Sequence, residues 1–143
     1  MTVPPALADI TYLVGRVLLG VILIAHGWQK LVANGISGTS AFFDQSGVPM
    51  PTVSAWFAAI VELVGGVALV LGVAVPVVAA LVVLDMLGAY LFVHAGKGLF
   101  IEKGGFELVG LIAAGCLLLL AVGGGRYSID HVLLSRRRSP VRA

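Results

Sequence analysis

Several ionisable side chains interrupt the long apolar stretches of this sequence. A charged group inside such a stretch is costly to remove from water, so each one is a candidate functional residue. Imidazole and carboxylate groups can transfer protons, whereas ammonium and guanidinium groups can hold an anion. The groups concerned are Arg16, His26, Lys30, Glu62, Asp85, His94 and Glu107.

The depth of these groups along helices sorts them into two layers. A helix rises by about 1.5 Å per residue, which places Arg16 roughly 9 Å and Asp85 roughly 12 Å from one set of helix ends. Because their charges are opposite and their heights similar, we predict an inner Arg16–Asp85 ion pair. Two alternatives stay open: the pair only fixes which helices adjoin, or Arg16 instead reaches toward Glu62.

A second layer is expected roughly 20–24 Å from the same helix ends. We predict that His26, Glu62 and Glu107 form an outer cluster there, with Lys30 and His94 at its mouth. Such a cluster would serve as a proton relay or as the site of a polar ligand. It contains more polar groups than helix registry requires, so the sequence favours a functional site.

Other chemistries have weaker support. Cys116 is the single cysteine, which excludes an internal disulfide, a CxxC couple and a thiolate metal cage, and we interpret it as a core residue. A metal could be bound by His26, His94, Glu62 and Glu107, but no HxxxH or ExxH spacing supports it. Haem ligation by His26 and His94 has no further motif in its favour, and the two residues differ in depth. We therefore predict no metal and no bound cofactor. No nucleophile elbow or phosphate loop is recognisable.

The elements that must hold these groups follow from the composition. Of 143 residues, 59% are hydrophobic and 11% are charged, and the mean hydropathy is +1.08; a soluble domain is about a quarter charged. A helix needs about 20 apolar residues to cross a bilayer. We predict an all-α membrane protein, an antiparallel bundle of four transmembrane helices. The predicted spans are residues 10–32, 53–75, 77–94 and 106–122.

Small residues indicate which helix faces turn inward. Glycine and alanine let helices approach closely, and they share or adjoin the helix face of Glu62. Arg16, Asp85 and Glu107 also have glycine or alanine at helical spacing. We therefore predict that all four helices direct their charged groups into the bundle. The small residues around Glu62 are Ala55, Ala58, Ala59, Gly65 and Gly66.

The segments outside the spans predict the orientation and the domain plan. The C-terminus carries Arg136, Arg137, Arg138 and Arg142, and the turn between the second and third spans is uncharged. The positive-inside rule therefore places both termini in the cytoplasm. The loop 33–52 is expected to hold a short interfacial helix, capped by Ser37 or Thr39. We predict a transmembrane domain over residues 1–132 and a basic cytoplasmic tail over residues 133–143, which anchors the chain and binds no nucleic acid.

Short motifs occur in order along nearly the whole chain. They are RVLLG at 16–20, HG at 26–27, KL at 30–31, FF at 42–43, GVP at 47–49, Glu62 followed by GG at 65–66 and LG at 71–72, HAGKG at 94–98, GGFE at 104–107 and GRYSID at 125–130. Each motif alone is weak, but the ordered set is specific. Together they resemble the DoxX family of membrane proteins, including its DoxD-like members.

The resemblance implies a four-helix membrane fold and an association with redox chemistry. Relatives in the family include subunits of thiosulfate:quinone oxidoreductase, and others work in membrane complexes with soluble sulfur-transfer or oxidative-stress enzymes. A quinone or a small sulfur species is therefore the candidate ligand, and soluble redox proteins or further copies of the chain are the candidate partners. The resemblance also implies the bacterial plasma membrane.

Three functions stay open, and whether the chain is itself an enzyme stays open with them. A redox-linked subunit, in which Glu62 and His26 handle protons and Arg16 and Lys30 hold an anion, predicts an apolar slot beside Glu62 or His26. A non-enzymatic anchor for a soluble oxidoreductase predicts a tightly packed polar interior. A small transporter predicts a continuous wet path that joins the two layers.

Overall fold

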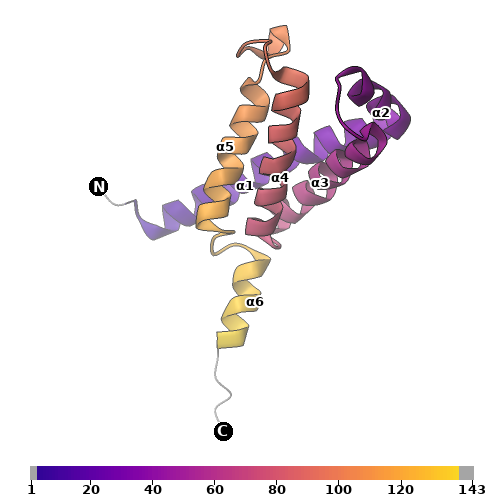
Figure 1. The fold of residues 1–143 in the computed structure, drawn as a ribbon. Coiled ribbons are helices and arrows are strands. Elements are labelled where there is room, and N and C mark those ends of the chain that lie inside the picture. Colours follow the sequence, from indigo (N-terminus) through magenta and orange to yellow (C-terminus); the bar gives the residue numbers. More distant parts are fainter. Residues whose placement is uncertain (1–2, 139–143) are drawn as a thin grey trace.

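The computed structural model describes residues 3–138, and this part of the chain is helical without any strand (Figure 1). Two of the main helices are extended by a π-helical turn at their C-terminal end. The helices are α1 (Pro5–Trp28) with the π turn Gln29–Ala33, α2 (Gly35–Gln45), α3 (Pro51–Leu71), α4 (Val75–Ala89) with the π turn Tyr90–His94, the 3-10 turn Ile101–Lys103, α5 (Glu107–Val122) and α6 (Ile129–Arg138).

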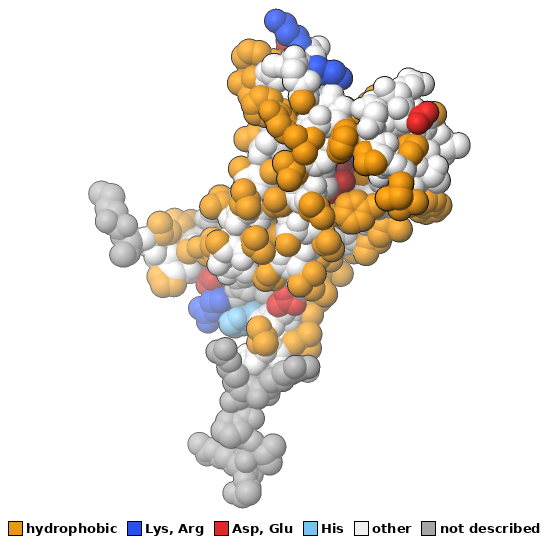
Figure 2. Space-filling view, viewed as in Figure 1, with side chains coloured by type: hydrophobic (Ala, Val, Ile, Leu, Met, Phe, Trp, Pro, Cys, Tyr) orange, Lys and Arg blue, Asp and Glu red, His pale blue; other side chains and the backbone are white. Residues whose placement is uncertain are grey.

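Four of these helices are apolar enough to lie in a bilayer. The segments Pro5–Ala33, Pro51–Leu71 and Val75–His94 are also long enough to cross it, and α5 is a shorter apolar helix. Large apolar side chains such as Leu18, Val64, Leu111 and Leu118 are exposed on them. Figure 2 shows hydrophobic side chains covering the helices and charged ones gathered mainly at the two ends. Such a surface is suited to lipid, so the chain is a helical membrane protein.

The four apolar helices form two antiparallel pairs. Figure 1 shows α1 running beside α3, and α4 running beside α5, with the two pairs crossing each other. The pairs diverge toward the end that carries α2 and residues 95–105, which we call the loop end. At the opposite end, here the terminal end, lie the α3–α4 turn and residues 123–130.

Small residues explain the close contact of α1 with α3. The predicted stripe around Glu62 is buried, and a Cβ atom added at Gly66 would lie 2.7 Å from the carbonyl oxygen of Gly20. The two backbones thus touch with no side chain between them. A hydrophobic core continues toward α4 and α5, and Cys116 belongs to it, as predicted. The other fully buried members of this core are Leu23, Leu69, Val75, Ala79 and Val82.

Two helix boundaries differ from the predicted ones because a proline and a glycine that mark helix ends were overlooked. α1 begins at Pro5, ahead of residue 10, because proline is favoured in a first helical turn. α3 ends at Leu71, ahead of residue 75, because Gly72 adopts a left-handed conformation (φ 73°) that terminates the helix. The predicted helix in the first loop is present as α2, but the predicted caps are wrong. Thr39 lies buried inside α2, where its hydroxyl donates to the Lys30 carbonyl (2.9 Å).

The C-terminal segment closes the terminal end of the bundle. The Asp130 carboxylate accepts hydrogen bonds from the backbone N–H groups of Ala74 (2.8 Å) and Val75 (2.9 Å), at the start of α4. The Asp130 N–H in turn donates to the Gly72 carbonyl (3.0 Å). Asp130 lies in the first turn of α6, which crosses the predicted boundary at residue 132, so the division into two domains stays a prediction. Residues 139–143 of the predicted tail, Arg142 included, lie outside the described residues.

Replacing Asp130 by alanine should lower the free energy of unfolding by about 1–2 kcal/mol, because two N–H groups at the start of α4 lose their acceptor. Thermal unfolding of the purified protein in detergent measures the effect. Asp44→Ala is the matched control, because Asp44 is exposed near the C-terminal end of α2 and should not stabilise that helix. An unchanged melting temperature in Asp130→Ala would mean that the cap contributes nothing.

Candidate functional site

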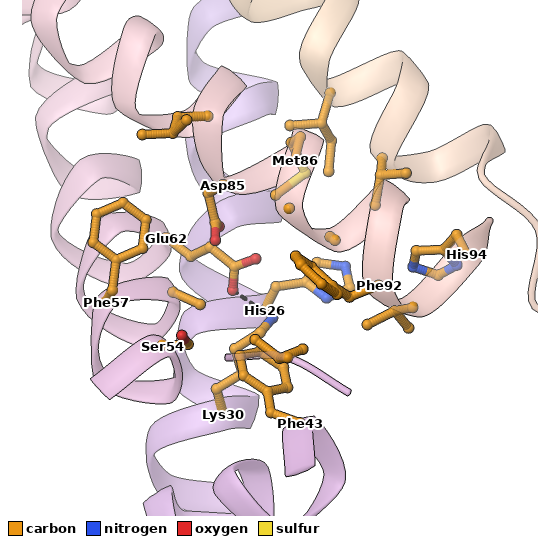
Figure 3. Close-up of a pocket in the computed structure, with 18 of the residues that line it drawn as sticks. His26, Lys30, Phe43, Ser54, Phe57, Glu62, Asp85, Met86, Phe92 and His94 are labelled. Atoms are coloured by element: carbon orange, nitrogen blue, oxygen red, sulfur yellow. Dashed lines mark hydrogen bonds and ion pairs between the residues drawn. The ribbon is translucent and has the colours of Figure 1, made fainter. Parts of the chain in front are cut away.

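A cavity of about 400 Å³ lies between the helix pairs at the loop end. Its walls come from α1, α3, α4 and α5, and residues of α2 and of the two loops border it. Most of the lining is apolar, including Phe42, Phe43, Phe57, Met86 and Phe92. In Figure 3 the labelled aromatic rings surround a small group of polar side chains. The polar residues that line the cavity are His26, Lys30, Ser54, Glu62, Asp85 and His94.

An ion pair between α1 and α3 lies in the cavity wall. Lys30 Nζ donates to Glu62 Oε2 at 2.6 Å (Figure 3), and the Glu62 side chain is only 6% exposed. Lys30 belongs to the π turn that follows α1, and the hydroxyl group of Thr39 in α2 donates to the Lys30 carbonyl. π turns leave the regular helical ladder and often occur at functional sites. This local backbone therefore holds the ammonium group over the carboxylate.

Asp85 faces this ion pair from α4. Figure 3 shows its carboxyl group pointing toward Glu62. Asp85 Oδ2 is buried and has no hydrogen-bond partner in the described part of the protein. Gly88, Ala89 and Phe92 line the cavity at helical spacing from Asp85, so one face of α4 forms this wall. A buried acceptor without a donor is uncommon in folded proteins, and a donor group of a ligand would satisfy it.

The predicted ion pair between Arg16 and Asp85 is not formed. Among the side chains of residues 3–135, which the structure describes, the ion pairs are Lys30–Glu62 and Asp9–Arg126. Arg16 is buried at the terminal end, where its Nη2 group donates to the Tyr127 carbonyl (2.8 Å) and its Nη1 group lies against Gly72. Asp85 lies ten residues beyond the start of α4, roughly 15 Å from the level of Gly72. The segment 125–130 folds back against the α3–α4 turn and supplies an acceptor for Arg16 there, so the guanidinium group lies at the terminal end and not at the level of Asp85.

The structure brings together most, but not all, of the predicted outer cluster. His26, Glu62, Lys30 and His94 line the cavity, whereas Glu107 does not. The reason lies in the faces of α5: Leu108 and Ile112 line the cavity, and Glu107 shares the other face with the exposed Leu111. His94 Nδ1 is within hydrogen-bond distance of the Gly104 carbonyl (2.7 Å), which ties the π turn after α4 to the following loop.

Sequence reasoning missed Asp85 as a member of this site. Gly88 and Ala89, three and four residues further on, had correctly indicated that Asp85 faces the bundle, but its height was assigned to the level of Arg16. The aromatic lining from α2, Phe42 and Phe43, was also missed as part of the site. Aromatic residues near membrane boundaries are common, so their types alone did not indicate a cavity.

The charges in the cavity favour some ligands over others. Two carboxyl groups, Glu62 and Asp85, face one ammonium group, Lys30, and that group is already paired. A bound anion would therefore meet an unpaired carboxylate in an apolar surrounding. A neutral ligand with an apolar body and a few hydrogen-bonding atoms suits this lining better.

Comparison with known sequences identifies the family. The profile of the family described as DoxX matches residues 11–95, which include α1 from residue 11 onward, all of α2, α3 and α4, and most of the residues that line the cavity.

The chain belongs to the DoxX family.

Three relatives illustrate what is known of this DoxX protein's neighbours. The "Putative oxidoreductase CatD" of Bacillus subtilis is 33% identical over 83% of each chain. The "Inner membrane protein YqjF" of Escherichia coli is 32% identical over 89% of this chain and 95% of its own. The "Uncharacterized membrane protein Rv3486" of Mycobacterium tuberculosis is 31% identical over 85% of this chain and 80% of its own. No solved structure matches this chain. The relatives are bacterial, two are named as membrane proteins, and one name refers to redox chemistry.

Proposed function

We propose that this DoxX protein is a redox-linked membrane subunit that binds a quinone in the cavity at the loop end. The observation that carries the proposal is the apolar cavity beside Glu62 and His26. Its volume of about 400 Å³ falls within the range of roughly 300–1,000 Å³ that is usual for small-molecule sites. A quinone ring is planar and apolar and carries two oxygen atoms, so it matches a lining of phenylalanines with a few polar groups.

The polar groups of the cavity suit the proton chemistry of such a ligand. Reduction of a quinone to a quinol takes up two electrons and two protons. The ammonium group of Lys30 and the imidazole of His26 can donate to a carbonyl oxygen, and the carboxyl groups of Glu62 and Asp85 can exchange protons with the loop end. The electrons would come from a soluble redox partner, which is part of the proposal.

The two alternative functions have less support. An anchor needs only a filled and self-satisfied interior, whereas the cavity and the unpartnered oxygen of Asp85 are unnecessary for it. A transporter needs a polar path from the cavity to Arg16, but fully buried apolar residues of the core, such as Leu23, Leu69 and Val82, lie between the two levels. A small sulfur anion in the cavity would be repelled by Asp85.

The membrane topology belongs to the same proposal. We infer four crossings with both termini in the cytoplasm of a bacterial plasma membrane, because the arginines gather at the C-terminal end of the chain. The cavity then faces the outer half of the bilayer, and α2 lies near the outer headgroups. Assembly with soluble redox proteins or with further copies of the chain stays a proposal of the family resemblance.

Binding of decylubiquinone and of thiosulfate to the purified protein tests this function. We expect saturable binding of the quinone, no binding of thiosulfate, and a loss of about tenfold or more in affinity in Glu62→Gln and His26→Ala, because each change removes a polar partner in the cavity. Glu107→Gln is the matched control, since Glu107 lies outside the cavity. Its affinity should equal that of the wild type.

Two results would contradict the proposal. If the folded wild type binds no quinone, the anchor function becomes the better supported one, and protein partners should be sought. If all variants bind the quinone as the wild type does, the ligand site lies elsewhere.

A further inference from the structure

We propose that the cavity binds a ring hydroxyl group and thereby selects the reduced, hydroxyl-bearing form of its ligand, with Asp85 as the acceptor. The inference rests on the proposed function, because it assumes that a quinone or quinol enters the cavity. It adds to that function a preference between the two redox forms of the ligand: the site binds a hydroquinone more tightly than the corresponding quinone. Asp85 becomes a ligand-binding residue, which neither the sequence motifs nor the relatives' names indicate.

The first observation is the unpartnered oxygen of Asp85. Oδ2 is buried in the cavity wall and receives no hydrogen bond from the described residues. An ionised carboxylate is only an acceptor, so it needs a donor. The charged groups that face it are Glu62, which offers no donor when ionised, and Lys30, whose ammonium group donates to Glu62 at 2.6 Å. A hydroxyl group of the ligand can supply the donor that completes this site.

The second observation is the apolar surface around Asp85. Met86 and Phe92 line the cavity from the same helix, and Phe57 lines it from α3. Figure 3 shows the side chains of Asp85 and Phe57 on the same side of the cavity as Glu62. An aromatic ring in this space has apolar contacts on its faces while its substituents meet the polar group. The lining thus suits a ring that carries a hydroxyl group.

The oxidised and reduced ligands differ in what they offer Asp85. The oxygen atoms of a quinone are acceptors only, so the bound quinone leaves Oδ2 without a donor and places two electron-rich oxygens near each other. A hydroquinone offers O–H groups, and a bond from O–H to a carboxylate is short and strong. His26 and Lys30 can serve the second ring oxygen in either form. The hydrogen bond to Asp85 therefore favours binding of the hydroquinone over binding of the quinone.

A redox-inert pair of probes tests this preference: para-heptylphenol and its methyl ether, which has the same ring and chain but no donor. We expect the wild type to bind the phenol about 10- to 100-fold more tightly than the ether, as for a hydrogen bond to a charged group. Asp85→Leu should bind both probes equally. Asp85→Asn, which keeps a neutral oxygen acceptor, should retain part of the preference. Decylubiquinol and decylubiquinone under anaerobic conditions should follow the same order.

The outcomes separate this inference from the function on which it rests. Equal binding of phenol and ether by the wild type would overturn the inference, and this result needs no variant to fold. A preference that persists in Asp85→Leu would assign the acceptor role to another residue and would also overturn it. Tight binding of decylubiquinone with no preference for the quinol would keep the proposed function and reject Asp85 as the selector. If neither quinone nor quinol binds, the proposed function fails first.

Discussion

Replacing Gly66 by valine should force α1 and α3 apart and lower the free energy of unfolding by about 3 kcal/mol or more. A Cβ atom at this position would lie 2.7 Å from the Gly20 carbonyl oxygen and 2.8 Å from the Ile24 nitrogen. Both atoms belong to the backbone of α1, so no side chain can rotate away. Overpacking of a well-packed interior costs about 1–3 kcal/mol, and a clash between two backbones lies at the upper end of that range or beyond it.

The single cysteine provides the measurement for this variant. Cys116 is fully buried in the core, so a thiol-reactive dye reports unfolding as the protein is heated in detergent. Gly15→Val is the matched control, because Gly15 lies on α1 with open space around it. We expect the control to melt within a few degrees of the wild type and Gly66→Val to melt well below it. Equal melting of the two variants would mean that the crossing of α1 and α3 tolerates a side chain.

Replacing Lys30 by methionine should lower the free energy of unfolding by about 3 kcal/mol, because it leaves the carboxylate of Glu62 buried without its partner. The double variant Lys30→Met with Glu62→Leu should recover most of that loss, since it removes both charges and fills the space with apolar groups. Thermal unfolding of the two single variants and the double variant gives the coupling energy between the residues.

An exposed ion pair of the same protein is the control. Arg126 Nη1 lies 3.6 Å from Asp9 Oδ2, and the Arg126 side chain is 70% exposed. Arg126→Met should therefore change the stability by less than about 1 kcal/mol. If Lys30→Met is as mild as Arg126→Met, the Lys30–Glu62 pair is effectively solvated and the cavity is wetter than its lining suggests.

These two predictions together separate the roles of packing and chemistry in the fold. The glycines of α1 and α3 hold the first helix pair together, whereas the Lys30–Glu62 pair is expendable for stability once both charges are gone. We therefore expect the double variant to be stable and to have lost the quinone binding proposed above. If the double variant is stable but binds no quinone, the Lys30–Glu62 pair serves ligand binding and not the stability of the fold.

The sequence predicted the helices well because their cause is local. Runs of apolar residues are a property of each segment, so they indicate four apolar helices whatever the packing. The end signals are equally local, but those at Pro5 and Gly72 were overlooked, and two boundaries were therefore misplaced. The inward stripe around Glu62 was predicted for a similar reason, since small residues at helical spacing define one face of α3. Glu62, Lys30, His26 and His94 were accordingly recognised as candidates before their contacts were known.

The partners of the charged residues could not be predicted in the same way. Which groups meet depends on the height and rotation of each helix relative to the others, and an error of a few residues moves a side chain by roughly 5 Å. That is why Asp85 lies in the cavity instead of beside Arg16, and why Glu107 faces away from it. The role of Arg16 also depends on residues 125–130, which return to the α3–α4 turn from more than fifty residues further along the chain.

The sequence by itself determined that this is an apolar helical membrane protein with ionisable groups in its helices, because composition and periodicity are properties of each segment alone. Only the tertiary structure decided that α1 with α3 and α4 with α5 form two diverging pairs, and that the space between them is a cavity. The π turn that brings Lys30 over Glu62 and the unpartnered oxygen of Asp85 belong to that second level. They arise from the packing of helices on one another, which no single segment specifies.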